Sequence, residues 1–126
     1  MKFAVYLFAA TIAAQSAFAS CPTSPPETVW NTHDGDQHVN AEYLQKILAG
    51  NSVKYGREGT EYYNNNGTYV FSTSAGELRA PSYKYYEDGT RCINTVNPRF
   101  DLFVVNDRRL ILITNDGTRL EGQIKR

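Results

Sequence analysis

Most of the chain shows a two-residue alternation of apolar and polar positions, which is typical of β-strands with one buried face. The alternation begins near Asn51 and is interrupted by turn dipeptides, the clearest being Asn66-Gly67, Asp88-Gly89, Asn106-Asp107 and Asp116-Gly117. Asn66-Gly67 is typical of a type I′ hairpin turn. Every connection is short, whereas a parallel crossover needs about a dozen residues, so neighbouring strands should pair antiparallel. The pattern predicts a mainly β fold: an up-and-down meander of about seven or eight strands that forms a small barrel or a bent sheet.

A helical spacing at residues 40–50 predicts one short helix before the strands. Asn40 suits the N-cap and Gly50 suits the left-handed position after the last turn. The apolar positions between them fall on one face of a helix: Tyr43, Leu44, Ile47 and Leu48. A helix this short is unstable alone, so we expect it to pack on the sheet.

Two strand segments, 102–105 and 110–113, are apolar at every position. Such strands are covered on both faces, because large apolar patches are rarely left exposed to water. We expect the helix to cover the outer face of this hairpin and the barrel interior to cover the other. The alternative is a surface for a partner or for a second copy of the chain.

The N-terminus has the pattern of a secretory signal peptide, residues 1–19. Lys2 is its only charge, an apolar run spans residues 3–14, and Ala17-Phe18-Ala19 is a small-x-small cleavage site. The run is too short for a transmembrane helix, so no membrane span is expected. Residues 20–38, rich in Pro, Ser and Thr, are predicted to form an extended tail, and residues 39–126 a single β-rich domain. The leader predicts a periplasmic or secreted protein.

The two cysteines have alternative fates that depend on how the leader is cleaved. Cleavage after Ala19 in an oxidising compartment favours a disulfide between Cys21 and Cys92. Phe18-Ala19-Ser20-Cys21 also resembles a bacterial lipobox, in which Cys21 would carry a lipid anchor and Cys92 would stay a free thiol. The sequence leaves both open.

Aromatic residues are the first candidates for a ligand or partner surface. Trp30 lies alone in the polar tail, where it either docks on its own domain or contacts a partner or a sugar ring. Tyr83, Tyr85 and Tyr86 lie on one predicted strand, with Tyr86 on the face opposite to the other two. They stabilise the sheet as cross-strand pairs, or they form an aromatic strip that binds a ligand.

Composition and motifs limit the kinds of partner, metal site and catalytic site that we expect. Acidic and basic residues balance at 13 each, so no basic field indicates a nucleic-acid partner. The one cluster of metal-type ligands is His33, Asp34, Asp36 and His38, whose spacing matches no strong metal motif and also fits a solvated turn. We recognise no catalytic residues in the sequence, and we expect no cofactor.

Short motifs within residues 40–124 carry a family resemblance. They are the helix end Leu48-Ala49-Gly50-Asn51, the Tyr- and Gly-rich strands, the turn of residues 86–92 and the terminal Asp116-Gly117 hairpin. Together they resemble small uncharacterised periplasmic or secreted β-meander proteins of bacteria. Some of these have a second Cys soon after the first, where this chain has Asn97-Pro98-Arg99. The resemblance implies a fold and an exported location, and it assigns no catalytic residue or substrate.

These observations favour a non-enzymatic binding or inhibitor-like module that recognises a protein, a glycan or a small apolar ligand. One alternative is a lipid-anchored envelope component with a structural or assembly role. The other is a metal-dependent enzyme that uses the cluster of residues 33–38.

Overall fold

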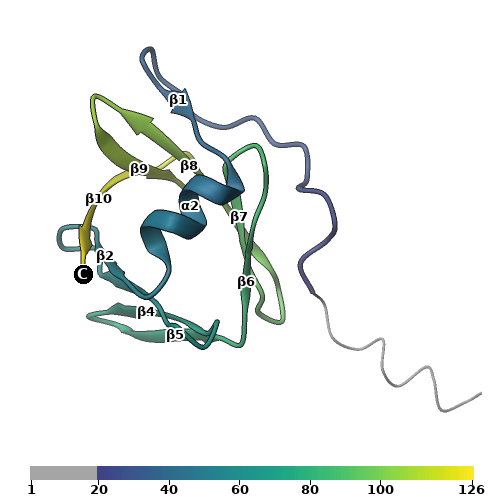
Figure 1. Ribbon diagram of the computed structural model, residues 1–126, viewed down its shortest axis with the longest axis vertical. Helices are drawn as coiled ribbons and strands as arrows, with labels where there is room; N and C mark the ends of the chain where they lie inside the picture. Colours follow the sequence, from purple (N-terminus) through teal and green to yellow (C-terminus); the bar gives the residue numbers. More distant parts are fainter. Residues whose placement is uncertain (1–19) are drawn as a thin grey trace, which may run out of the picture.

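The computed structural model describes residues 20–126, and the predicted signal peptide, residues 1–19, lies outside this part of the chain. Within it the chain forms one helix and ten strands (Figure 1). In chain order these are β1 (Gln37–His38), α2 (Ala41–Leu48), β2 (Ser52–Lys54), β3 (Thr60–Tyr63), β4 (Tyr69–Thr73), β5 (Gly76–Ala80), β6 (Tyr83–Tyr85), β7 (Thr90–Ile93), β8 (Arg99–Asn106), β9 (Arg109–Ile113) and β10 (Arg119–Lys125). No helix among residues 20–126 has the length and apolar character needed to cross a membrane.

The strands form one antiparallel sheet that curls into a nearly closed barrel. The order is β5-β4-β3-β2-β10-β9-β8-β7-β6, so the first and last strands of the meander, β2 and β10, pair with each other. The two ends of this order, β5 and β6, are consecutive in the chain. The predicted mainly β meander is confirmed, although it has nine strands instead of seven or eight, and β1 is a tenth strand outside it. The strand outside the meander, β1, is a two-residue pairing of the polar tail with β8, which alternation alone does not reveal.

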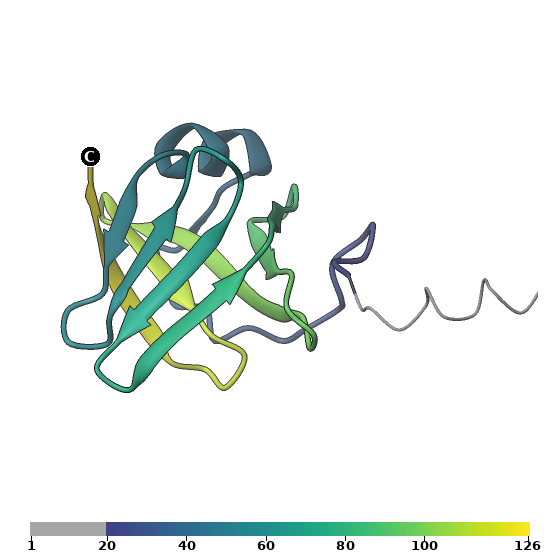
Figure 2. The same ribbon diagram turned by 90° about the horizontal axis from the view of Figure 1, so that it is seen from below.

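The helix closes one end of the barrel. Its N-cap is Asn40, whose side chain accepts a hydrogen bond of 2.8 Å from the Tyr43 amide, and Gly50 follows its end with φ of 73°. Leu44 and Leu48 are fully buried in the same core cluster as the inward-facing residues of the strands, whereas Tyr43 stays exposed. Figure 2 shows the helix across one end of the barrel and hairpin turns at the opposite end.

Asn66-Gly67 does form a turn, but the prediction that it is a type I′ turn is wrong. Gly67 has φ of 87°, but Asn66 does not have the positive φ that a type I′ turn requires of both central residues. The Asn66 side chain instead accepts a hydrogen bond from the Thr68 amide, which holds a longer loop. The two adjacent positive φ values occur at Asp107 and Arg108, between β8 and β9.

The N-terminal segment, rather than the helix, covers the outer face of β8 and β9. Trp30 packs there against the second core cluster, which consists of Leu102, Val104, Ile111 and Ile113. The expectation that the helix covers this face is therefore wrong. The helix lies instead across one end of the barrel, where Leu44 and Leu48 fill the interior.

Candidate binding site

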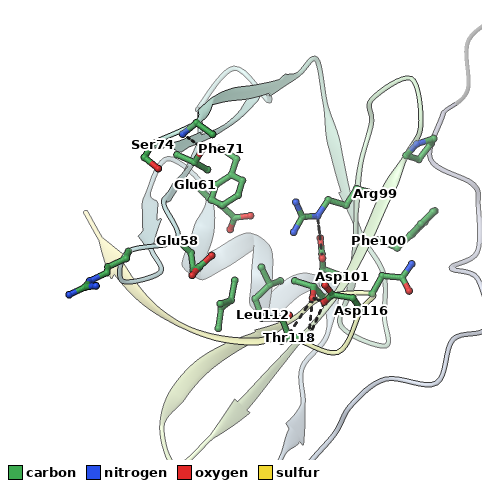
Figure 3. Close-up of a pocket in the computed structure, with 17 residues that line it drawn as sticks. Glu58, Glu61, Phe71, Ser74, Arg99, Phe100, Asp101, Leu112, Asp116 and Thr118 are labelled. Atoms are coloured by element: carbon green, nitrogen blue, oxygen red, sulfur yellow. Dashed lines mark hydrogen bonds and ion pairs between the residues drawn. The ribbon is translucent and has the colours of Figure 1, made fainter.

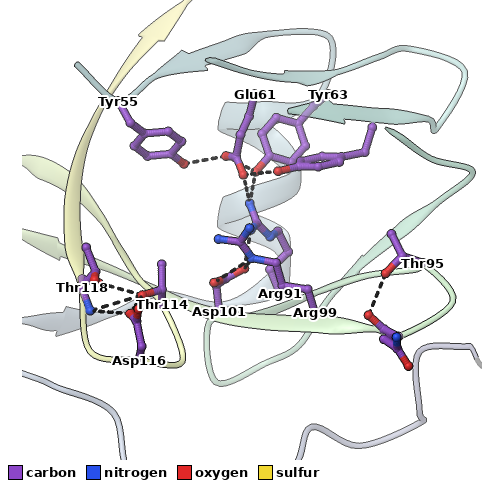
Figure 4. A network of polar contacts seen from close by, with 12 residues as sticks. Tyr55, Glu61, Tyr63, Arg91, Thr95, Arg99, Asp101, Thr114, Asp116 and Thr118 are labelled. Atoms are coloured by element: carbon purple, nitrogen blue, oxygen red, sulfur yellow. Dashed lines mark hydrogen bonds and ion pairs between the residues drawn. The ribbon is translucent and has the colours of Figure 1, made fainter. Parts of the chain in front are cut away.

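A network of buried charges crosses the barrel interior (Figure 4). Glu61 of β3, Arg91 of β7 and Asp101 of β8 all have side chains no more than 2% exposed. The guanidinium of Arg91 lies between the two carboxylates, with Nη1 bound to Glu61 and Nη2 bound to Asp101. Burial of this kind is tolerated because each charge has an opposite partner.

Three tyrosine hydroxyls complete the coordination of Glu61. Tyr55 and Tyr63 donate to Oε1 at 2.6 and 2.8 Å, and Tyr69 donates to Oε2. Burial, reinforced by the negative charge of Glu61, raises the pKa of Tyr55 and Tyr63 well above the ordinary tyrosine value. These hydroxyls therefore remain protonated donors at neutral pH. With Arg91 included, both oxygens of Glu61 have two donors each, so this carboxylate has no capacity left for a ligand.

A cavity of about 850 Å³ lies between this network and the end of the barrel opposite the helix. Its walls are apolar side chains of three strands together with charged groups: Phe71, Leu112, Leu120, Glu61, Asp101 and Arg99 (Figure 3). The turn residues Arg57, Glu58 and Asp116 lie at its rim. The Asp116 carboxylate is held within its own turn by Thr114 and Thr118.

Arg99 is the charged group of this wall that keeps free donors. Its Nε donates to Asp101 Oδ2 at 3.0 Å, and its guanidinium carbon lies 5.9 Å from the centre of the Phe71 ring. Among residues 20–126, Nη1 and Nη2 of Arg99 make no protein hydrogen bond. The side chain is 35% exposed, and Figure 3 shows its guanidinium directed into the space that Phe71 and Leu112 border.

The two cysteines form a disulfide, Cys21–Cys92, with a Cα–Cα distance of 5.9 Å. It anchors the N-terminal segment to β7, where the Tyr86 hydroxyl also donates to the carbonyl of Pro22 at 2.6 Å. A sulfur in a disulfide cannot also carry a thioether-linked lipid, so the two fates considered for Cys21 exclude each other.

The predicted aromatic surface is divided between two environments. Tyr83 and Tyr85 point into the barrel, where their rings contact Tyr63 at centroid distances of 5.3 and 6.3 Å. Tyr86 is buried on the opposite face, under the N-terminal segment. Trp30 packs on β8 and β9, as described above. These four residues therefore do not form one exposed strip.

The four candidate metal ligands are not gathered around a common point. The Asp36 carboxylate binds the guanidinium of Arg119 at 2.8 and 2.9 Å and the Asn106 amide at 2.8 Å. The hydrogen bonds from Arg119 lower the pKa of Asp36 far below the usual aspartate value. His33, Asp34 and His38 are exposed, and within residues 20–126 no group of three or more His, Cys, Asp or Glu is placed to hold a metal ion.

Sequence reasoning missed the polar groups of the cavity. Glu61 and Asp101 look like scattered carboxylates, and Arg91 and Arg99 like ordinary surface arginines. A signal was present in the alternation, because Glu61 shares a strand face with Tyr63, Arg91 with Ile93 and Asp101 with Phe103. In these three strands the charged side chain faces inward together with the core residue two positions away.

Comparison of the chain with protein-family models, with curated proteins and with solved structures finds no match.

Proposed function

We propose that this protein is an exported, non-enzymatic binding module that holds a small molecule in the open end of its barrel. The observation that carries the proposal is the cavity of about 850 Å³ in a barrel whose other end is filled by the helix. Its size lies within the range of roughly 300–1,000 Å³ typical of small-molecule pockets.

The make-up of the wall supports binding rather than catalysis. The two buried carboxylates are occupied by Arg91, Arg99 and three tyrosines, so neither is free to act as a general base. The remaining wall combines apolar side chains with a few polar groups, which is the usual composition of a ligand pocket.

A neutral fluorescent probe, N-phenyl-1-naphthylamine, tests the proposal. We expect a saturable rise in its fluorescence with one site per chain. Leu120→Trp should fill part of the cavity and weaken this binding, because Leu120 lines the wall. Glu121→Trp is the matched control, since the neighbouring side chain is exposed on the outside of β10. No saturable binding by the wild type, or equal effects of the two substitutions, would contradict the proposal.

Export is the second part of the proposal, and the leader pattern and the disulfide support it. The intact mass of the protein from its natural host, measured with and without reductant, tests it. We expect a chain that begins at Ser20 with one oxidised cysteine pair. A chain that keeps residues 1–19 would contradict export, and a lipid-modified Cys21 would favour the envelope-anchored alternative.

A further inference from the structure

The charged groups around the cavity differ in how much bonding capacity they retain. Glu61 accepts four hydrogen bonds, and Asp101 accepts from both Arg91 and Arg99. Arg91 is completely buried. Inside the rim formed by Arg57, Glu58 and Asp116, a ligand therefore meets two satisfied carboxylates and Arg99, whose Nη1 and Nη2 have no partner among residues 20–126.

Arg99 is oriented to donate hydrogen bonds to an acceptor group of a ligand. A guanidinium has five N–H donors in a planar fork, and the described residues use only the Nε–H of Arg99. Its pairing with Asp101 and its position near the Phe71 ring restrict its orientation before any ligand arrives. The two terminal nitrogens match the two oxygens of a carboxylate, which a guanidinium binds in bidentate fashion.

The charge balance limits the ligand to a single negative charge. The two buried carboxylates and the two guanidiniums of Arg91 and Arg99 cancel, so the wall as a whole neither attracts nor repels an anion strongly. The rim contains one basic residue, Arg57, against two acidic ones, Glu58 and Asp116. A polyanion such as a nucleotide phosphate would be strongly repelled at this rim, whereas a monoanion meets less repulsion and gains two charge-assisted hydrogen bonds from Nη1 and Nη2 of Arg99.

The rest of the cavity wall is apolar and favours a ligand with an apolar body. Phe71 and Leu120 are half-buried at the cavity, and Leu112 lies behind them in the core. Apolar ligand atoms packed against these side chains leave water, which is the main driving force for binding in such pockets.

Building on the proposed function, we infer that the ligand is an amphipathic monocarboxylate, with its carboxylate on Nη1 and Nη2 of Arg99 and its aromatic or aliphatic body against Phe71, Leu112 and Leu120. The inference assigns Arg99 as the residue that determines specificity. The buried network below it serves to hold Asp101, and through Asp101 the guanidinium, in place.

Two ligands of nearly the same shape test this inference. 4-Phenylbutyrate carries the carboxylate, and 4-phenylbutan-1-ol replaces it with a neutral hydroxyl. Their affinities are measured at pH 7 by displacement of N-phenyl-1-naphthylamine and by calorimetry. We expect the acid to bind about tenfold more tightly than the alcohol, as is typical of a hydrogen-bonded charge.

Substitutions then assign the preference to one residue. Arg99→Gln should remove the preference for the acid and leave the affinity for the alcohol within about twofold of wild type. Arg99→Lys keeps the charge but loses the fork, so the preference should be reduced but not abolished. Arg109→Gln is the matched control, because Arg109 is a half-exposed arginine that does not line the cavity, and it should leave both affinities unchanged.

The outcomes separate this inference from the proposed function. Suppose that the neutral probe binds, but that the alcohol binds as tightly as the acid or that neither displaces the probe. The inferred ligand class is then wrong, whereas the proposed function as a small-molecule binding module is retained. If Arg99→Gln weakens both ligands equally, Arg99 only supports the wall and the inference is overturned. If the neutral probe itself does not bind to the wild type, the proposed function fails.

Discussion

Replacing Glu61 with glutamine should be far more damaging than the same change at Glu77. Both glutamates lie on strands and pair with an arginine. Glu61 and Arg91 have side chains 2% and 0% exposed, whereas Glu77 and Arg79 have side chains 45% and 71% exposed. Removing one partner of a buried pair leaves an uncompensated charge and typically costs about 3–5 kcal/mol of stability. An exposed pair contributes only about 0–1 kcal/mol.

The hydrogen bonds of Glu61 strengthen this expectation. All four groups around its carboxylate are donors. The amide of Glu61→Gln would place an NH₂ group against donors on one side and would remove the charge that balances Arg91. We therefore expect the loss at Glu61 to lie at the upper end of the range for a buried pair.

Urea unfolding followed by circular dichroism at pH 7 measures the two variants with the disulfide intact. A domain of this kind is stable by about 5–15 kcal/mol, so the predicted loss moves the midpoint of Glu61→Gln strongly downwards. Glu77→Gln should unfold close to wild type. If the two variants lie within about 0.5 kcal/mol of each other, well below the buried-pair cost, the buried network is not what holds the two sides of the barrel together.

Three further predictions use the same measurement. Gly89→Ala should cost about 2 kcal/mol more than Gly67→Ala. Both positions have similar positive φ, 91° and 87°, but an added Cβ at Gly89 meets two backbone oxygens at 2.9 Å while Gly67 faces open space; equal losses would show that only the backbone conformation matters. Trp30→Ala should lose about 2 kcal/mol by uncovering the outer face of β8 and β9. Val29→Ala, at a side chain 99% exposed, should change little, and a similar effect of both would mean that the N-terminal segment does not cover this face in solution. The lowered pKa of Asp36 in the folded state gives stability that is complete above the ordinary aspartate pKa of about 3.9 and is lost as the pH falls below it. The stability difference between wild type and Asp36→Asn should therefore shrink on acidification, and a difference that does not vary with pH would contradict the ion pair.

Local features of the chain were predictable because their causes lie within a few residues. Asn40 caps the helix through the amide three positions later, and Gly50 takes the left-handed conformation that ends it. Most strands follow from their alternation, and the two apolar segments, 102–105 and 110–113, are separated by the turn dipeptide Asn106-Asp107. The type of the Asn66-Gly67 turn was not predictable from the dipeptide, because the side chain of Asn66 stabilises a different loop through its hydrogen bond to Thr68.

The candidate site was largely hidden, because its members are brought together only when the barrel closes. Arg91 is 30 residues from Glu61 and 10 from Asp101, and no local pattern indicates that they pair. The sequence did show which strand face each occupies. It did not show that these faces converge below a cavity, or that Nη1 and Nη2 of Arg99 have no hydrogen-bond partner among residues 20–126.

Local sequence patterns were enough to predict the helix, the main strands of the meander, their antiparallel pairing and two cysteines able to pair. Long-range packing decides that the helix fills the barrel end, that Trp30 covers the outer face of β8 and β9, and that Cys21 pairs with Cys92. The physical reason is range: capping and alternation act between near neighbours, whereas burial and charge pairing depend on which distant segments share the same interior.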